Sequence, residues 1–210
     1  MKLFIKKVEG ITLPSKANAL DAGYDIVATS GPNIVADKED IINPHGILDD
    51  NPTLYRRITY IEYDTNLYWT PKTEFVRQVE NAQADASGAL CGLVFKEETQ
   101  TYHIELFPRS SISKYNLVLA NSVGTVDTGY RNQVKARFKY VWQPQDLLPY
   151  RNSKDDYEIV GIPNQNYLYQ KGDKIMQMKP RLNVNIEIDL VDELPETDTR
   201  GLGGFGSSGV

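Results

Sequence analysis

Apolar and polar residues alternate along several stretches of this chain. The clearest is 184–190, where an apolar residue stands at every second position. Residues 134–140 and 102–106 alternate in the same way. A period of two places one face of a β-strand against a core and the other face in water. We therefore predict a strand in each stretch, with the basic residues of 134–140 on its solvated face.

Shorter stretches that are rich in β-branched and aromatic residues predict further strands. They lie at 3–8, 24–28, 58–63, 90–95, 118–121, 158–162 and 174–178. Many short strands without intervening helices are typical of an antiparallel sandwich or jelly roll and not of a parallel α/β sheet. The expected fold class is therefore all-β, a jelly-roll barrel.

One stretch, 73–82, predicts a short helix. Its apolar residues fall on one helical face: Phe75, Val76, Val79 and Ala82. Thr73 can cap the start of this helix, and Gly88 lies beyond its end. We expect a helical excursion from the barrel here.

Two stretches predict irregular connections. Residues 31–66 contain the turn-forming pairs Gly31-Pro32, Asn43-Pro44 and Asn51-Pro52. Residues 143–156 contain two prolines and a run of charged residues. Proline and glycine interrupt regular structure, so both stretches are expected to be loops.

The composition narrows the classes of function. The chain has 210 residues, 40% of them hydrophobic, which suits one domain with a sizeable core. It has no run of about eighteen apolar residues, so no membrane-spanning helix is expected. Its one cysteine, Cys91, cannot form an internal disulfide and indicates a reducing, intracellular setting. With two histidines it offers little material for a zinc site.

The formal net charge of −5 argues against a protein that coats DNA or RNA, because binding to a phosphate backbone needs a basic surface. A small anionic ligand held by a few arginines remains compatible with it. Arg109, Ser110 and Ser111 follow a predicted strand and could bind such an anion. Taken alone, this stretch is better interpreted as a solvated turn with a surface arginine.

Residues 121–131 predict a hairpin connection between the strands at 118–121 and 134–140. Asn121, Asp127 and Tyr130 would present an amide, a carboxylate and an aromatic ring there. Asp127 could serve as a general base towards water. Because Asp-Thr-Gly is also good turn chemistry, the sequence leaves both interpretations open.

The C-terminal part differs from the rest. Between Arg181 and Arg200 there are six acidic residues and no basic one, and five of the last ten residues are glycine. A segment with so little apolar surface does not fold alone. It is either a linker or a ligand-binding arm in which Arg200, Phe205 and two serines contact a phosphate and a base.

Five segments, taken in order, resemble the five motifs of the homotrimeric deoxyuridine triphosphatase (dUTPase) family. They are 21–26, 108–113, 124–131, 172–177 and 200–209. Such an order, with the glycine-rich segment last, is not expected by chance. The resemblance covers little of 31–98 or 142–167.

The resemblance implies a dUTPase-like jelly-roll domain at 1–199 and an arm at 200–210 that closes over the active site. Within the domain we interpret about 31–100 and 142–167 as insertions. It also implies a homotrimer with three shared active sites, in which 184–190 is lent to a neighbouring subunit. The reaction would be hydrolysis of dUTP to dUMP and pyrophosphate with Mg2+, in the cytoplasm, which keeps uracil out of DNA and supplies dUMP.

The resemblance further implies a role for individual residues around the nucleoside. Asn121, with the backbone of Gly124, Thr125 and Val126, would pair with the uracil edge. A buried polar edge discriminates strongly because the wrong base leaves groups unpaired. Tyr130 would pack on the deoxyribose and exclude a 2′-hydroxyl. Asp127 would orient and deprotonate the water that attacks the α-phosphorus.

The remaining roles concern the phosphates. Arg109, Ser110, Ser111 and Gln177 would hold the phosphate chain, and Asp25 would act through water bound to Mg2+. In the arm, Phe205 would cover the uracil, while Arg200, Gly206, Ser207 and Ser208 would close over the γ-phosphate. Ser111 replaces a glycine that many members of the family carry.

Other functions stay open at this point. A sister activity on the same fold deaminates dCTP, alone or in a bifunctional relative. A nucleotide-responsive regulatory binder and a purely structural jelly roll, such as a virion component, are further alternatives. The insertions either enlarge the surface or bind a regulatory protein, as insertions in some phage members of the family do. Membrane association and stable nucleic-acid binding are not expected.

Overall fold

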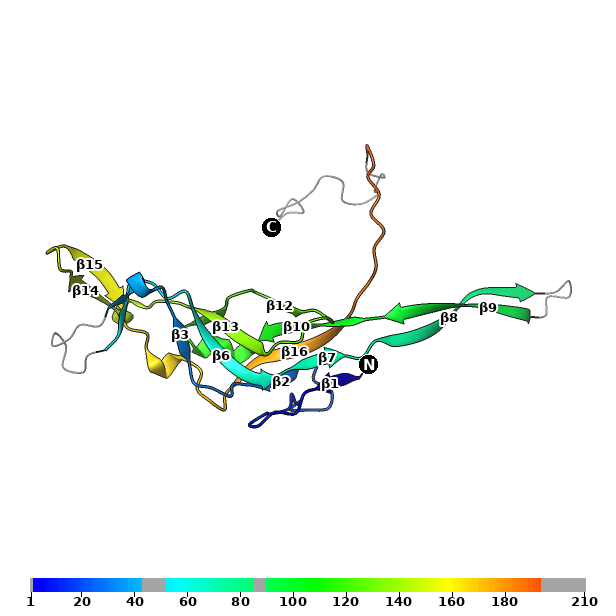
Figure 1. The fold of residues 1–210 in the computed structure, drawn as a ribbon, viewed down its shortest axis with the longest axis horizontal. Coiled ribbons are helices and arrows are strands. Elements are labelled where there is room, and N and C mark those ends of the chain that lie inside the picture. The colour runs from blue at the N-terminus through cyan, green and yellow to red at the C-terminus, as the bar shows by residue number, and fades with distance from the viewer. Residues whose placement is uncertain (1, 43–51, 85–89, 194–210) are drawn as a thin grey trace, which may run out of the picture.

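The computed structural model describes residues 2–42, 52–84 and 90–193. These residues form strands β1 to β16 and four 3₁₀ helices of three to five residues, so the chain is all-β as predicted. Figure 1 shows an elongated body, a two-stranded arm at one end and a C-terminal extension that leaves the body. Among the described residues, no helix has the length and apolarity needed to cross a membrane.

The first of two central sheets has the strand order β12-β10-β16-β2 and is antiparallel. Its strands are β12 (Gly124–Val126), β10 (Tyr102–Pro108), β16 (Lys174–Leu182) and β2 (Tyr24–Val27). These strands confirm the predictions at 24–28, 102–106 and 174–178.

The second central sheet has the order β11-β13-β6-β3. Its strands are β11 (Leu117–Leu119), β13 (Val134–Tyr140), β6 (Tyr60–Leu67) and β3 (Asn33–Val35). In β13, buried and exposed residues alternate without a break, as the period of two predicted.

The inner faces of the two sheets share one hydrophobic core. Phe138 on β13 and Tyr63 on β6 are fully buried and meet edge to face at a centroid distance of 5.8 Å. The ring of Tyr169, just before β16, packs on both of them. Such aromatic contacts add to the stabilisation that burial of the rings already gives.

Two smaller sheets flank this body. One pairs β1 (Leu3–Ile5) with β7 (Trp69–Pro71). The other has the order β14-β15-β5-β4. Its strands are β14 (Leu147–Arg151), β15 (Tyr157–Gly161), β5 (Leu54–Tyr55) and β4 (Ile41–Ile42).

A close packing contact ties this second small sheet to the body. Gly161 at the end of β15 lies under Trp142, and a Cβ atom at Gly161 would stand 2.3 Å from the indole ring. Only glycine fits there. The connections 31–66 and 143–156 were predicted to be irregular, but both contain strands. β3 pairs with β6, β4 pairs with β5, and β14 pairs with the neighbouring β15. Two of these strands also pair with distant segments, β6 with β13 and β5 with β15.

The predicted helix at 73–82 is wrong. The segment forms β8 (Glu74–Ala84), which pairs with β9 (Leu90–Gln100) in the arm at the right of Figure 1. Helical spacing of four apolar residues is a local signal, and the adjacent strand-forming segment supplies a hairpin partner that overrides it. Gly88 lies outside the described residues.

The four 3₁₀ helices are η1 (Lys38–Asp40), η2 (Ser110–Lys114), η3 (Pro144–Asp146) and η4 (Gln165–Tyr167). Residues 184–190 form no strand in the single chain. They extend away from the body in Figure 1, and Ile186 and Ile188 are 76% and 83% exposed. The apolar residues of this alternating stretch therefore do not pack on the core of their own chain.

Candidate functional site

The first central sheet carries four of the five segments that resemble dUTPase motifs. Asp25 lies on β2, Gln177 lies on β16, and Arg109 directly follows β10. The strand register places Gln177 opposite Asp25, and Gly124 of β12 opposite Leu106 of β10. Antiparallel pairing thus brings together segments that are far apart along the chain.

Asp25 is the centre of one group, which we call the Asp25 cluster: Asp25, Arg109, Lys174 and Gln177. The carboxylate is 3% exposed. Its Oδ1 accepts hydrogen bonds from Arg109 Nε at 2.9 Å and Gln177 Nε2 at 3.1 Å. Its Oδ2 lies 2.9 Å from Lys174 Nζ. Three predicted site residues, from β2, β16 and the end of β10, therefore meet as expected.

The partners of Asp25 keep it ionised. Burial by itself raises the pKa of the carboxyl group, but hydrogen bonds from Lys174 and Gln177 and the charge of Arg109 outweigh it, so the pKa lies below its ordinary value. A buried carboxylate needs such partners because an unpaired charge is costly to desolvate.

Sequence analysis missed Lys174 in this cluster. The β2–β16 register shifts between Lys174 and Met176. Such an irregularity can place a side chain on the face of the sheet opposite to the one that strict alternation would give it. A period of two therefore could not have predicted that Lys174 reaches Asp25.

Ser110 and Ser111 open η2, directly after Arg109. The backbone N–H of Ile112 donates to the carbonyl of Arg109 at 3.0 Å, which closes the turn. Ser110 is exposed and Ser111 is partly buried. Both serines follow Arg109 of the Asp25 cluster directly in the sequence.

A second group lines a pocket of about 220 Å³, which we call the hairpin pocket. It is lined by Asn121, Gly124, Thr125, Val126 and Tyr130, with Leu106, Val134 and Lys135. The first five are predicted site residues, and the structure brings them together.

Local backbone geometry shapes the hairpin pocket. A Cβ atom at Gly124 would stand 2.9 Å from Asn121 Nδ2, so a side chain there would displace the amide. Ser122 has a φ of 59°, in the left-handed region that residues other than glycine rarely occupy. Such strain is often retained at functional sites, where the surrounding structure fixes it.

Asp127 and Tyr130 lie in the turn beside this pocket. The Tyr130 N–H donates to the carbonyl of Asp127 at 3.0 Å, and the Tyr130 hydroxyl donates to the carbonyl of Gln133 at 2.9 Å. Asp127 is exposed, and in the described part of the chain its carboxylate has no hydrogen bond or ion pair. It is therefore accessible to a water molecule or a ligand.

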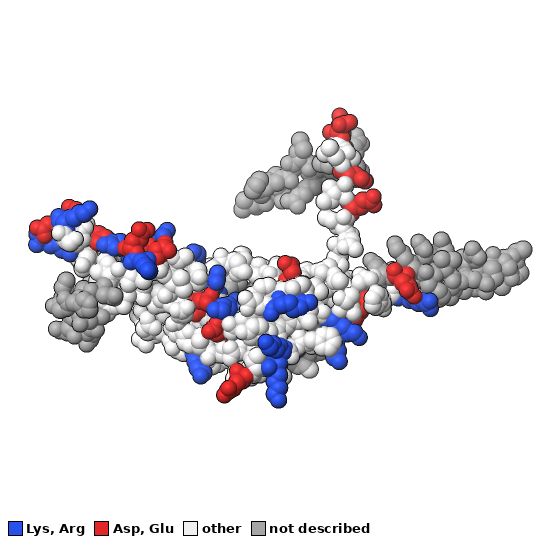
Figure 2. All heavy atoms as spheres, in the orientation of Figure 1, with Lys and Arg blue, Asp and Glu red and all other residues white. Residues whose placement is uncertain are grey.

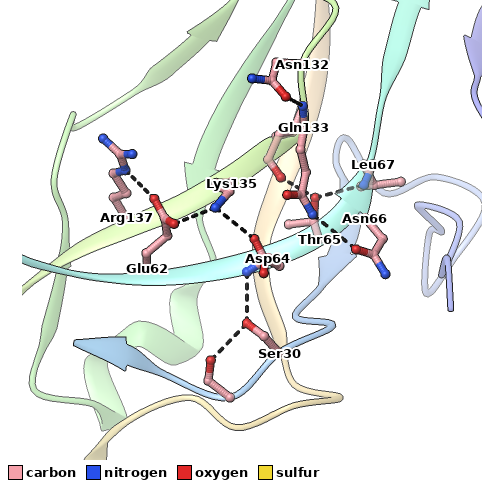
Figure 3. Close-up of polar contacts among 12 residues, drawn as sticks. Ser30, Glu62, Asp64, Thr65, Asn66, Leu67, Asn132, Gln133, Lys135 and Arg137 are labelled. Carbon is pink, nitrogen blue, oxygen red and sulfur yellow. Dashed lines mark hydrogen bonds and ion pairs between the residues drawn. The ribbon is translucent and has the colours of Figure 1, made fainter. Parts of the chain in front are cut away.

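An ionic network forms the wall behind the hairpin pocket (Figure 3). Lys135 Nζ lies 2.6 Å from Glu62 Oε1 and 3.1 Å from Asp64 Oδ1, and Arg137 Nε lies 2.8 Å from Glu62 Oε2. Burial raises the pKa of Glu62, but hydrogen bonds from both cations outweigh it and lower the pKa below the ordinary value. The alternation of 134–140 placed these basic residues on a solvated face, but Glu62 was not identified as their partner, although it lies in the strand predicted at 58–63.

The Asp25 cluster and Asp127 do not meet within one chain. In the β10–β12 register, Ile104 pairs with Val126, so Asp127 stands opposite His103, six residues before Arg109. At the rise of about 3.4 Å per residue, the two places are about 20 Å apart along the sheet. The predicted arm residues Arg200, Phe205, Gly206, Ser207 and Ser208 lie outside the described residues.

Charges are mixed over the surface. On the face shown in Figure 2, acidic and basic side chains of the described residues stand next to one another, and the C-terminal extension carries acidic ones. Arg56 and Glu158, for example, form a pair at 2.7 Å. Several described cationic side chains, among them Arg57, Lys135 and Arg181, likewise pair with acidic neighbours.

Comparison with known proteins agrees with this geometry. The dUTPase of Finegoldia magna is 36% identical over 109 residues, which are 51% of this chain and 61% of that protein. The dUTPase of Desulfitobacterium hafniense strain Y51 is 37% identical over 110 residues, 50% of this chain and 56% of that protein. The chain thus spans about three-fifths of the length of these curated relatives. No protein-family model matches it.

Solved structures show the same fold. A variant of the Staphylococcus bacteriophage 80alpha dUTPase with dUpNHpp aligns with a TM-score of 0.59 and 18% identity, over 100% of this chain and 99% of that one. The chain is a relative of the dUTPases. A variant of the dUTPase of phage phi11 of S. aureus, reported with a structural Mg(II) ion, aligns with a TM-score of 0.52 and 17% identity, over 93% of this chain and 100% of that one.

Proposed function

We propose that this chain hydrolyses dUTP to dUMP and pyrophosphate by attack of water on the α-phosphate, in the cytoplasm. The observation that carries the proposal is the placement of the Asp25 cluster and the hairpin pocket on one sheet of the dUTPase fold. Both are built from residues that resemble the family's motifs, in the family's order.

The Asp25 cluster suits the phosphate chain. Arg109 uses Nε to bind Asp25, and its guanidinium has further N–H donors with which it can bind a phosphate. Ser110, Ser111 and Gln177 would add neutral donors. Asp25 thus acts chiefly by fixing the direction of Arg109.

The hairpin pocket suits the nucleoside. Asn121 and the backbone of Gly124–Val126 would bind the uracil edge, and Tyr130 would pack against the deoxyribose. Asp127, exposed and unpaired among the described residues, would orient the attacking water and accept its proton.

The proposed site suits Mg2+ only when the ion is bound to the phosphates of the substrate. Asp25 is surrounded by two cations and an amide, and no group of three His, Cys, Asp or Glu residues in the described chain could hold a metal ion. The residues therefore agree with a metal held mainly by the phosphates, with Asp25 in contact through water. When bound, Mg2+ supplies charge neutralisation on the triphosphate.

A homotrimer would unite the two groups. One chain separates Asp127 from Arg109 by about 20 Å at the usual strand rise, so a site that uses both needs two subunits. The exposed, alternating residues 184–190 offer each subunit a strand to place on a neighbour. Three shared sites follow from this arrangement.

The test is product analysis with dUTP, dCTP, UTP and the other dNTPs in the presence of Mg2+. Release of pyrophosphate from dUTP, but not from dCTP or UTP, is expected. Ammonia release from dCTP would instead identify the deaminase, and no reaction with any nucleotide would favour a regulatory or structural role.

A second proposed role is binding of a regulatory protein. One phage dUTPase among the structural relatives is described as controlling transfer of virulence genes. Here the β8–β9 arm and the β14–β15 sheet carry exposed apolar residues, with Phe75, Tyr157 and Ile159 exposed by 81%, 75% and 63%. Exposed apolar side chains at projecting elements suit a protein contact.

A further inference from the structure

The direction of the Asp127 carboxylate depends on the backbone of its turn, because the carboxylate itself has no partner in the described chain. The residue that follows it, Thr128, is held by three other parts of the molecule. These contacts were not predicted from the sequence, in which Thr128 is only a turn residue.

The carbonyl oxygen of Thr128 accepts from two donors. Arg131 Nη1 donates to it at 2.6 Å, and the same nitrogen donates to the carbonyl of Tyr130 at 2.9 Å. The hydroxyl of Thr70 on β7 lies 3.3 Å from the Thr128 carbonyl and equally far from that of Pro71. A hydroxyl has one proton, so Thr70 shares it between the two carbonyls.

The hydroxyl of Thr128 is engaged as well. It donates to the carbonyl of Tyr102, at the start of β10, at 2.7 Å. It accepts from Asn183 Nδ2 at 3.4 Å, which is a weaker contact. The donor and one acceptor site of the hydroxyl, and both acceptor sites of the carbonyl, thus have partners.

Asn183 is itself fixed at the root of the C-terminal extension. It directly follows β16, and its backbone N–H donates to the carbonyl of Thr101 at 2.9 Å. Its Nδ2 donates to the hydroxyl of Thr101 at 2.7 Å, and its Oδ1 lies 2.6 Å from His103 Nδ1. The extension therefore leaves the body at a point bonded to the turn of Asp127.

We propose that Thr128 is the positioning residue that aims Asp127 at the attacking water, and that Asn183 connects this turn to the C-terminal extension. The inference rests on the proposed hydrolysis of dUTP. Thr128 touches no reacting atom; it acts by fixing the backbone that follows Asp127, where the Tyr130 N–H also binds the Asp127 carbonyl, while the pairing of Val126 with Ile104 fixes the backbone that precedes it.

Two variants separate this role from simple stabilisation. Thr128→Val removes the hydroxyl and keeps the shape of the side chain, whereas Thr128→Ser keeps the hydroxyl. Thr59→Val is a matched control, because the hydroxyl of Thr59 is buried and has no hydrogen-bond partner in the described structure. The full-length proteins are compared in kcat and KM for dUTP with Mg2+, in affinity for dUpNHpp, and in amide hydrogen exchange of residues 127–131.

We expect Thr128→Val to lower kcat about tenfold or more, since misplacement of a catalytic group by about 1 Å costs up to about a hundredfold. Affinity for dUpNHpp should stay within about threefold, because the hairpin pocket is unchanged. Thr128→Ser should recover most of the rate, and exchange at 127–131 should accelerate in Thr128→Val only. Thr59→Val should match the wild type.

Asn183→Ala tests the connection to the extension. It should lower kcat less than Thr128→Val does, because the 3.4 Å contact is the weaker one. Combined with Thr128→Val its effect on kcat should be smaller than in the wild-type background, since the Asn183–Thr128 bond is already absent there, whereas the bonds of Asn183 to Thr101 and His103 are lost in both backgrounds. Full additivity of the two losses would contradict the connection.

The outcomes distinguish the inference from the function on which it rests. Wild-type protein that leaves dUTP uncleaved contradicts the proposed function and, with it, the role of Thr128. Active wild-type protein with an equally active Thr128→Val variant contradicts the positioning role alone. So does a Thr128→Ser variant as slow as Thr128→Val, or a loss of dUpNHpp affinity in proportion to kcat.

Discussion

At the residue scale, the site depends on two carboxylates in opposite environments. Asp25 is buried, and its carboxylate forms hydrogen bonds or ion pairs with Arg109, Lys174 and Gln177. Asp127 is exposed and unpaired among the described residues. The first suits a fixed structural charge that orients a phosphate-binding arginine, and the second suits a group that exchanges protons with water.

The partners of Asp25 predict an acid-dependent loss of stability. Its pKa is lower in the folded protein than the ordinary value of 3.8, so its contribution is present above that value and is lost as the pH falls through the folded pKa. The urea midpoint of the wild type should therefore drop below about pH 4, and this part of the drop should be absent in Asp25→Asn.

Asp155→Asn is the control for this measurement, because Asp155 is exposed and pairs only with Arg151 at 3.1 Å. It should change the urea midpoint little at any pH. An Asp25→Asn variant with the pH dependence of the wild type would show that the Asp25 ion pairs do not contribute to stability.

Asp127→Asn should lower kcat for dUTP by about 10²- to 10⁴-fold, the usual contribution of a general base. The amide keeps the size of the side chain but accepts no proton, so the affinity for dUpNHpp should change little. Steady-state kinetics and calorimetric titration measure the two quantities. Turnover that survives the change would remove Asp127 from its role.

At the element scale, the strands of the central sheets carry the site and the β8–β9 arm stands apart from it. The residues of the Asp25 cluster and the hairpin pocket come from β2, β10, β12, β13 and β16 or from the turns next to these strands. β8 and β9 pair with each other and with no other described strand. The arm is therefore separable from the body.

Removal of the arm tests this separation. Phe75 and Thr99 stand opposite each other in the β8–β9 register, so 76–98 can be replaced by an Asn-Gly turn. Turnover of dUTP should stay within about twofold of the wild type, because projecting loops tolerate such changes. A large loss of turnover would place the arm in the active site or in the subunit contact.

At the scale of the whole molecule, the sheet register separates the two parts of the proposed site along β10. Arg109 and Asp127 stand at opposite ends of β10. Residues 184–190 leave their own body with their apolar side chains exposed. Both features are explained by an assembly in which neighbouring subunits complete each other's sites.

Mixed trimers provide a direct measurement of this division. Neither Arg109→Ala nor Asp127→Asn should be active alone, but co-expressed chains with different tags should form trimers in which about a quarter of the sites have both residues intact. Turnover should reappear to that extent. If the doubly tagged trimers stay inactive, each site draws both residues from one chain.

The alternation of apolar and polar residues by itself predicted the all-β class and strands such as β13, whereas 184–190, which alternates most clearly, forms no strand in the single chain. The unbroken burial pattern of β13 shows why: a period of two is a local property that any packed sheet enforces. The motif-like segments likewise named Asp25, Arg109, Gln177 and the residues of the hairpin pocket.

Only the tertiary structure decided which strands pair and which side chains contact one another. Residues 73–82 became a strand because β9 pairs with them, and Lys174 reached Asp25 because the register shifts beside it. Thr128 forms hydrogen bonds with β7, β10 and Asn183, which lie far from it in the sequence, and its proposed positioning role depends on these bonds. Strand pairing, register shifts and hydrogen bonds between distant segments depend on which segments of the chain meet. No local sequence pattern encodes which segments these are.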